Sequence, residues 1–329
     1  MPKVSFIIPT LNNERTMRNC LHSVFSQDFP VEDIEVIIVD GGSKDGTISI
    51  ANEFKVKIIH NKFSFQDSKY GSRNIGLAEA SGDFVCFLNA DQTLLNRAWI
   101  RTVLEPLLRD ETVSIAIARQ DIRPGSLWLN RYNTYCEFPF VSSIARASGV
   151  RSIYEFFDAR RTLTVNVARE SKMLTYVGSG MLIRRNILNQ VGGYDYDLDT
   201  AQRFVAIGQG YFATVPGAQV SHEHYLSNSI TEYIRHKLRY LNRYVSLREL
   251  GLRSSLLEKK LVGGTPSLSR KKILLVLLGT VTLWICLLET VAMIKKRRDW
   301  ACLLHPLLYL LVAAVYAMTF LRSRNMLRS

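Results

Sequence analysis

The chain lacks the sequence signatures of several common ligand-binding folds. It contains neither the G-x-G-x-x-G of a dinucleotide-binding turn nor the G-K-[ST] of a P-loop, so glycine cradles for phosphate are not expected. Its five cysteines have no metal-binding or disulfide spacing, which favours reduced thiols in a cytosol-facing protein. Met1-Pro2-Lys3 leads directly into an apolar run that is too short for a signal peptide, so we expect no secretion signal.

The first two thirds of the chain carry no net charge. Of the 42 Lys and Arg residues, 24 precede Tyr225, where 24 of the 29 Asp and Glu residues balance them. The other 18 basic residues accompany only 5 acidic ones, so the whole net charge of +13 lies in the last third. No nucleic-acid-binding motif accompanies this basic segment. We therefore expect a membrane surface, and not nucleic acid, as its partner.

Two short apolar runs near the start of the chain each end in a polar cluster. They extend from Val4 to Pro9 and from Ile34 to Val39, and the clusters that follow are Thr10-Leu-Asn-Asn-Glu14 and Asp40-Gly-Gly-Ser-Lys-Asp-Gly-Thr47. Unbroken β-branched runs of this length are typical of strands buried on both faces of a parallel sheet. Ligands bind at the carboxyl edge of such sheets, so both clusters should meet at one site. The hydroxyl, amide and carboxylate groups of these clusters are suited to hydrogen bonding with the base and ribose of a nucleotide.

A third buried strand is expected from Asp83 to Leu88, after a short strand at Lys57 to His60 and a helix at Gly71 to Ala80. It ends in Asn89-Ala-Asp91-Gln92. Carboxylate and amide oxygens at a strand end can hold a hard divalent cation, which prefers oxygen ligands. The same tetrapeptide is also ordinary turn chemistry, so its position after the third strand is what favours a metal site.

In order, the motifs P-T-L-N-N-E, V-D-G-G-S-K-D-G-T, G-S-R-N-I-G-L and F-L-N-A-D resemble those of glycosyltransferase family 2, the inverting nucleotide-sugar enzymes. The resemblance covers roughly residues 3 to 224 and implies an α/β GT-A fold, a mostly parallel sheet flanked by helices. It also implies a nucleotide-sugar donor and Mg²⁺ or Mn²⁺. Asn89 stands where the family has the first Asp of D-x-D. By position, the implied donor-binding residues are Pro9, Thr10, Asn12, Glu14, Asp40, Gly42, Arg73, Asn89, Ala90 and Asp91, and the implied metal-binding residues are Asp91, Gln92 and His222.

The catalytic base is expected after the sequence Val191-Gly-Gly-Tyr-Asp195. This stretch and the residues that follow resemble the family's G-G-[FY]-D and E-D-x-D-L-x-x-R, with Tyr196 in place of the usual Glu. The resemblance assigns Asp197 as the base, with Asp199 as the fallback. Inversion needs a carboxylate that takes the acceptor's hydroxyl proton. The alternative is that these aspartates only cap the helix that follows.

Several basic residues are candidates for binding phosphate or acceptor. Arg203 belongs to the family motif just described, and Arg235 and Arg239 lie in a segment that resembles a degraded Q-x-x-R-W of the processive polymerases. This degradation argues against a polysaccharide synthase. The two later arginines can meet the donor diphosphate or a lipid phosphate, or simply lie on an interfacial helix.

The C-terminal third differs in character from the rest. Two apolar segments, Ile273 to Ile294 and Trp300 to Leu321, each have 22 residues, and at about 1.5 Å per residue each is long enough to cross a hydrocarbon core of roughly 30 Å. Two transmembrane helices are therefore expected, although the basic loop Lys295 to Asp299 between them also permits a re-entrant or interfacial pair. The segment before them is basic, with leucines at helical spacing, and is expected to form interfacial helices.

These features predict three regions. Residues 1–224 form the GT-A catalytic domain with an acceptor-side insert at 119–172, residues 225–268 form interfacial helices and a linker, and residues 269–329 form a two-helix membrane anchor. The expected function is sugar transfer from a UDP- or GDP-sugar to a polyprenyl- or dolichyl-linked acceptor, with the catalytic domain facing the cytoplasm. Two alternatives stay open. One is a polyprenyl-phosphate monosaccharide synthase whose nucleophile is the lipid phosphate, and the other is a catalytically silent nucleotide-sugar-binding membrane scaffold.

Overall fold

The computed structural model divides the chain into two compact units, which are treated separately below. Unit 1 comprises Met1–Arg123 and Ser152–Glu223, and unit 2 comprises Pro124–Arg151 and His224–Ser329. Part of the expected insert thus belongs to each unit. The residues that the structure describes are 2–61, 68–135, 151–152, 162–166, 173–174, 180–194, 197–225, 227–249 and 284–314.

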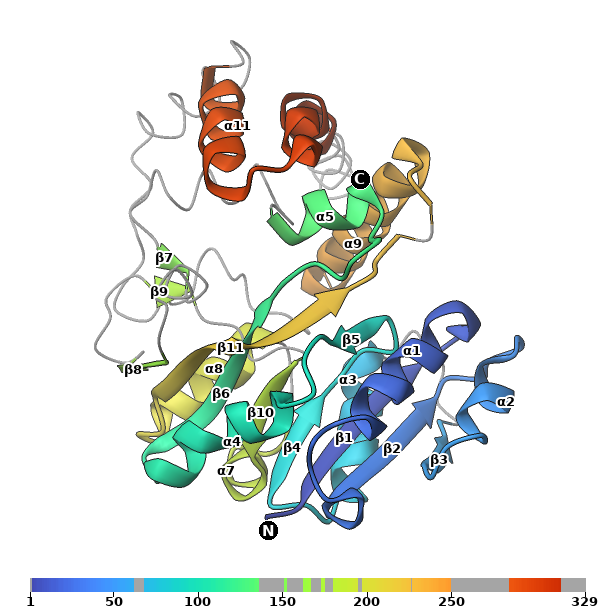
Figure 1. Ribbon diagram of the computed structural model, residues 1–329, viewed down its shortest axis with the longest axis vertical. Coiled ribbons are helices and arrows are strands. Elements are labelled where there is room, and N and C mark those ends of the chain that lie inside the picture. The colour runs from blue at the N-terminus through green and yellow to red at the C-terminus, as the bar shows by residue number, and fades with distance from the viewer. Residues whose placement is uncertain are drawn as a thin grey trace. The chain divides into compact units, whose positions relative to one another are not determined.

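A nine-stranded sheet forms the centre of unit 1 (Figure 1). Along the sheet, the strands follow one another in the order β3 (Lys57–His60), β2 (Ile34–Asp40), β1 (Val4–Thr10), β4 (Phe84–Phe87), β10 (Met181–Arg184), β6 (Val113–Gln120), β11 (Tyr211–His222) and β5 (Gln92–Leu94), with β8 (Leu163–Asn166) also paired to β11. A separate two-stranded sheet pairs β7 (Arg151–Ser152) with β9 (Met173–Leu174).

The sheet is parallel in one half and mixed in the other. Strands β3, β2, β1 and β4 are all parallel, as the unbroken apolar runs predicted. Beyond them, β10 is antiparallel to both of its neighbours, and β5 and β8 are antiparallel to β11. The expectation of a mostly parallel sheet therefore holds only for the N-terminal half. Antiparallel pairing of segments distant in sequence carries no local signal in a single chain.

Helices cover both faces of the sheet because its strands alternate which apolar side chains they present to each face. On one face, Phe6 and Ile8 pack in a core with α1 (Glu14–Phe25) and α4 (Trp99–Arg109). On the other, Ile7 packs in a core with α3 (Ser68–Ala78), α7 (Arg185–Gln190) and α8 (Asp197–Ala206). The other helices in the described part of unit 1 are η1 (Val31–Asp33) and α2 (Thr47–Ala51).

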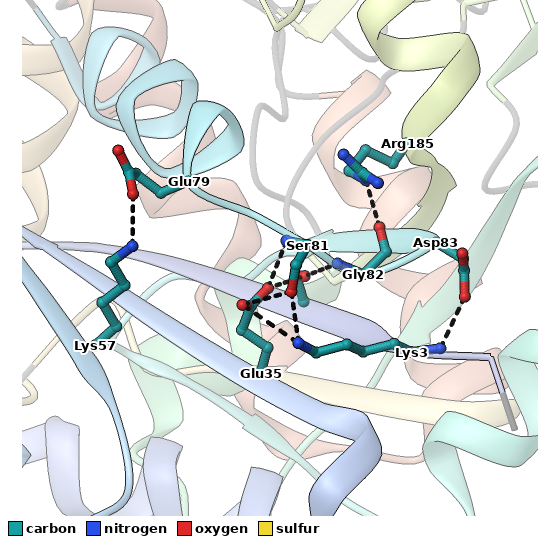
Figure 2. Close-up of polar contacts among 9 residues, drawn as sticks. Lys3, Glu35, Lys57, Glu79, Ser81, Gly82, Asp83 and Arg185 are labelled. Atoms are coloured by element: carbon teal, nitrogen blue, oxygen red, sulfur yellow. Dashed lines mark hydrogen bonds and ion pairs between the residues drawn. The ribbon is translucent and has the colours of Figure 1, made fainter.

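The amino edge of the parallel strands is closed by polar contacts (Figure 2). The carboxylate of Glu35 accepts hydrogen bonds from the Ser5 hydroxyl at 2.5 Å and from the backbone and hydroxyl of Ser81 at 2.8 Å each. Ser5 in turn accepts from the Gly82 backbone at 2.8 Å, and Lys3 donates its backbone N–H to Asp83 at 3.0 Å. Each hydrogen bond joins residues of neighbouring strands or of the turn before β4, so this cluster holds the starts of these strands together.

Unit 2 contains helices whose interior combines an apolar cluster, which includes Leu129, Leu308 and Val312, with several polar contacts. Its described elements are α5 (Trp128–Tyr135), α9 (Ile230–Glu249), α11 (Trp284–Arg297), η4 (Trp300–Leu304) and a helix at 305–314. Asp299 accepts hydrogen bonds from Arg131 Nε at 2.9 Å and from the Tyr135 hydroxyl at 2.8 Å. The ring of His305 lies 3.0 Å from the Tyr132 hydroxyl through Nδ1 and 3.0 Å from Glu289 through Nε2.

The two expected transmembrane helices are not supported. Among the described residues, no helix combines the length and the apolar character needed to cross a membrane. Helix α11 has 14 residues and overlaps the first expected span only from Trp284 onward. Residues 273–283 and 315–321 of the two spans lie outside the described residues, as do residues 250–268 of the expected interfacial region.

Candidate functional site

The ends of β1 and β2 lie side by side at the carboxyl edge of the sheet. Thr10 is the register partner of Asp40, and the Gly41 backbone donates to the Thr10 carbonyl at 2.9 Å. The buried carboxylate of Asp40 accepts from the backbone of Gly42 at 3.1 Å and from the Ser43 hydroxyl at 2.6 Å. Gly42 has a φ of 93°, which favours glycine at this sharp turn. The two clusters predicted to meet do so.

Asn12 joins the loops that follow β1 and β2. Its φ of 53° lies in the left-handed region, which Asn tolerates better than most residues. Its backbone donates to the Ser43 hydroxyl at 2.9 Å, and its side-chain oxygen accepts from the Lys44 backbone at 2.8 Å. Glu14 opens α1 directly after this turn and donates its backbone N–H to Asp45 at 3.1 Å. The two loops, with Pro9 at the end of β1, therefore form one hydrogen-bonded rim.

A tight turn follows β4. The Asn89 backbone donates to Gln92 Oε1 at 2.9 Å, the Gln92 backbone donates to the Asn89 carbonyl at 2.9 Å, and Ala90 is buried within the turn. The fully buried Gln92 thus uses its amide oxygen to hold the turn, a contact that the metal assignment did not anticipate. Cys20 lies beneath the turn, where burial, with a smaller effect of Asp91, raises the pKa of its thiol and keeps it protonated.

Asp91 and His222 meet at this turn. Asp91 Oδ1 lies 3.0 Å from His222 Nε2, because β11 pairs with β5 in a register that places His222 opposite Gln92. The Asp91 carbonyl also accepts from the Glu223 backbone at 2.8 Å, and Asn89 Nδ2 is 3.5 Å from His222 Nε2. A carboxylate and an imidazole at this separation are ligand types that suit a divalent transition-metal ion such as Mn²⁺. The structure thus brings these two predicted metal-binding residues together.

Arg73 lies inside the site and not at its rim. It is buried on α3, with its guanidinium carbon 4.5 Å from the ring centroid of Tyr194 and 5.3 Å from that of Phe87. Its Nη2 donates to Asn89 Oδ1 at 3.3 Å. Stacking on two rings retains a buried cation by cation–π attraction. Arg73 therefore links the turn after β4 to the segment that precedes α8.

Asn74, next to Arg73 on α3, holds the backbone of Tyr194 at two points. Its Nδ2 donates to the Tyr194 carbonyl at 2.6 Å, and its Oδ1 accepts from the Tyr194 N–H at 2.8 Å. Gly193 leaves room for this contact, since a Cβ there would lie 2.7 Å from Asn74 Oδ1. The sequence assigned Asn74 no role. Its only signal was its place beside Arg73 in a family motif.

Helix α8 begins at Asp197, three residues after Tyr194. The side chains of the two candidate bases, Asp197 and Asp199, lie outside the described part of the structure, so only their positions in the first turn are known. Arg203, in the last turn, is exposed and donates from Nη1 to the Val191 carbonyl at 3.4 Å. In unit 2, Arg235 and Arg239 are exposed on α9.

The comparison with protein families gives a match over more than half of the chain. A profile of the family described as Glycosyl transferase family 2 matches residues 5–192. The matched segment includes β1, β2, β4 and the turns that follow them, together with Arg73 and Asn74 on α3.

Two curated proteins are similar to part of the chain. Glycosyltransferase AglE of Haloferax volcanii is 38% identical over 94 residues, which are 28% of this chain and 31% of that protein. The GalNAc(5)-diNAcBac-PP-undecaprenol beta-1,3-glucosyltransferase of Campylobacter jejuni is 36% identical over 103 residues, which are 30% of this chain and 32% of that protein. The matched part of the chain thus spans less than a third of the length of either relative.

A solved structure resembles the chain over most of its length. The mannosyltransferase PcManGT from Pyrobaculum calidifontis, in complex with GDP-Man and Mn²⁺, has a TM-score of 0.56 and 16% sequence identity, and the match covers 97% of this chain and 87% of that chain. Together with the family match, this likeness confirms the α/β GT-A fold that the sequence predicted.

Proposed function

The chain belongs to glycosyl transferase family 2, and from this premise we propose that it transfers a sugar from a UDP- or GDP-sugar to a polyprenyl- or dolichyl-linked acceptor. One observation carries the proposal. Residues of one helix, Arg73 and Asn74, bind both the turn that carries Asp91 and the segment that leads into α8. A donor-binding edge and the start of the helix with the candidate base are thereby fixed to each other.

The proposed reaction inverts the anomeric carbon. The acceptor hydroxyl gives its proton to the Asp197 carboxylate and its oxygen bonds to the anomeric carbon, while the bond from that carbon to the diphosphate breaks and the nucleoside diphosphate leaves. A general base of this kind contributes about 10²- to 10⁴-fold in rate. Thr10, Asn12 and Asp40 lie on the rim that would hold the nucleoside, and Arg73 donates a hydrogen bond to Asn89 in the turn after β4.

The residues at the turn after β4 fit a divalent cation. Asp91 and His222 would hold it, since their ligand atoms already lie 3.0 Å apart at the sheet edge. Asn89 would contribute an amide in place of the second carboxylate, and its contacts with Arg73 and His222 fix its orientation. When bound there, Mg²⁺ or Mn²⁺ would supply positive charge that offsets the charge of the departing diphosphate.

The acceptor class and the membrane location rest on two observations. The Campylobacter jejuni relative is named for a substrate linked to PP-undecaprenol. In this chain, 18 of the last third's 23 charged residues are basic, which suits an anionic leaflet. Positive residues favour the cytoplasmic side of a membrane, so we place the catalytic unit there.

The variant Asp197→Asn tests the reaction. It should abolish transfer to a lipid-linked sugar acceptor while donor affinity stays within about twofold, because only the proton acceptor is removed. Asp28→Asn, at an exposed carboxylate that lies 3.9 Å from Arg101 and outside the candidate site, is the matched control.

Other outcomes decide between alternatives. Full activity of Asp197→Asn with a lipid phosphate as acceptor would indicate a polyprenyl-phosphate monosaccharide synthase, because a phosphate is already ionised at neutral pH and needs no base. Full activity with a hydroxyl acceptor would contradict the role of Asp197, and an inactive Asp199→Asn would then identify the base. Donor binding without transfer to either acceptor by the unmodified protein would indicate a silent scaffold.

A further inference from the structure

Two elements of unit 2 carry apolar side chains on their exposed faces. On α11, four exposed residues follow the spacing i, i+3, i+4, i+7, and the segment that begins with η4 has a similar stripe. Apolar patches of this kind on a protein surface mark a contact with another apolar phase. We call these the apolar stripes: Trp284, Leu287, Leu288 and Val291 on α11, and Trp300, Leu303, Leu307 and Leu310 on the second segment.

The inward faces of the same elements carry polar groups beside apolar ones such as Leu308 and Val312. His305 is fully buried between Tyr132 and Glu289, and Thr290 is buried one residue farther along α11. Asp299, between the two stripes, is buried against Arg131. Helices of a water-soluble protein normally turn such groups outward and leucines inward. Here buried Leu308 and Val312 accompany these polar groups, and yet large apolar side chains also cover the outer faces, which suits helices whose outer face contacts hydrocarbon.

We propose that the apolar stripes contact the acyl chains of an anionic phospholipid bilayer. Two features favour a bilayer over a protein partner. Lys295, Arg297 and Arg298 are exposed between the stripes and match anionic headgroups. The stripes begin with exposed Trp284 and Trp300, and tryptophan is enriched at the boundary between headgroups and acyl chains. The proposal deepens the membrane part of the proposed function, but its test needs no sugar transfer.

The two stripe tryptophans make the proposal measurable. The chain has four tryptophans, of which Trp99 is fully buried in unit 1 and Trp128 is partly buried. The full-length protein is reconstituted in phosphatidylcholine and phosphatidylglycerol vesicles with brominated acyl chains, and its fluorescence is compared with that in unbrominated vesicles. Bromine quenches only at short range, so tryptophans in contact with acyl chains lose emission.

We expect clear quenching of the unmodified protein and loss of more than half of it in Trp284→Phe/Trp300→Phe. The matched control Trp128→Phe should keep it. Leu288→Glu, at a side chain that is 65% exposed, should also reduce quenching, whereas Leu108→Glu, at a side chain that is 56% exposed on α4, should not. The conservative tryptophan variants decide the question if the glutamate variant fails to fold.

Two results would overturn the proposal. One is the absence of quenching in the unmodified protein, which is expected if a second copy or another segment covers the stripes. The other is unchanged quenching in Trp284→Phe/Trp300→Phe. Because fluorescence does not depend on catalysis, a protein that is quenched but transfers no sugar would contradict the proposed function and leave the membrane contact standing.

Discussion

Each of the two units contains a carboxylate–histidine pair, and the distance from the carboxylate oxygen to the histidine Nε2 is the same in both. In unit 1, Asp91 Oδ1 is 3.0 Å from His222 Nε2, and in unit 2, Glu289 Oε2 is 3.0 Å from His305 Nε2. Their surroundings differ. The side chains of Asp91 and His222 are 26% and 11% exposed, whereas those of Glu289 and His305 are 18% and 0% exposed. The first pair lies at a sheet's carboxyl edge, and the second is enclosed by helices and bonded to Tyr132.

The comparison shows that pair geometry alone does not identify a functional site. A histidine that is bonded through both ring nitrogens and fully buried, like His305, is already satisfied and has no access for a ligand. A partly exposed pair at the end of parallel strands can accept one. We therefore propose a metal-binding role for Asp91 and His222, and a structural role for Glu289 and His305.

The largest expected effect is the difference in transfer activity between two variants in which an amide replaces the carboxylate of one pair. Asp91→Asn should lower transfer by about a hundredfold or more, since a metal contact at a leaving group is worth several kcal/mol. It should also remove the thermal stabilisation that Mn²⁺ gives the unmodified protein. Glu289→Gln, the matched change in the second pair, should retain both. Loss of the Mn²⁺ response in Glu289→Gln, or its persistence in Asp91→Asn, would reverse the assignment.

The next effect tests whether the first pair works together with α8. Asn74→Ala removes both hydrogen bonds to Tyr194 and should lower kcat by about 10- to 100-fold, since a shift of about 1 Å in a catalytic group can cost that much. Donor KM should stay unchanged, because the rim at Thr10 and Asp40 does not contact Asn74. Asn186→Ala, at an exposed amide in the first turn of α7, is the control. If Asn74→Ala also loses donor affinity and thermal stability to a similar extent, Asn74 has only a structural role.

Much of unit 1 was predictable because its signals are local. The apolar runs ending at Pro9 and Val39 correspond to β1 and β2 within one residue, since a strand buried on both faces must be continuously apolar. The run from Asp83 to Leu88 brackets β4 in the same way. The meeting of the polar clusters at these strand ends followed from topology, because carboxyl ends of parallel strands share one edge, whereas the roles of individual residues came from the family resemblance.

The rest depends on partners that no local pattern reveals. Strand β10 pairs with β4 and β6, and Asn74 hydrogen-bonds to Tyr194. These contacts join residues about a hundred positions apart in sequence. In unit 2, hydropathy identified the apolar residues of α11 but not the polar contacts that its inner face makes. The pair of Glu289 and His305 is one of these contacts.

A smaller effect is expected on the stability of unit 2. Asp299→Asn removes the charge that Arg131 and Tyr135 bond to, and a buried charged hydrogen-bond partner is worth about 1–3 kcal/mol. Thermal unfolding in detergent should show the loss, with transfer activity per folded molecule retained. Glu105→Gln, in an exposed pair with Arg109, should change stability by less than about 1 kcal/mol. A large loss of transfer activity in folded Asp299→Asn would indicate a catalytic role for unit 2 and contradict the purely structural role proposed for its buried polar groups.

The smallest effect concerns a third carboxylate, Glu35, at the opposite edge of the sheet from Asp91. Burial alone would raise the pKa of Glu35, but hydrogen bonds from Ser5 and Ser81, with the charge of Lys3, outweigh it and lower that pKa. Its contribution, about 1 kcal/mol, is therefore present above the unfolded pKa of about 4.3 and lost as pH falls through the lower folded value. Glu35→Gln should remove this acid-dependent part of the unfolding free energy and leave kcat unchanged. If the slope of the unfolding free energy against pH below about 4.3 is the same in Glu35→Gln as in the unmodified protein, the Glu35 carboxylate does not stabilise the amino edge of the sheet.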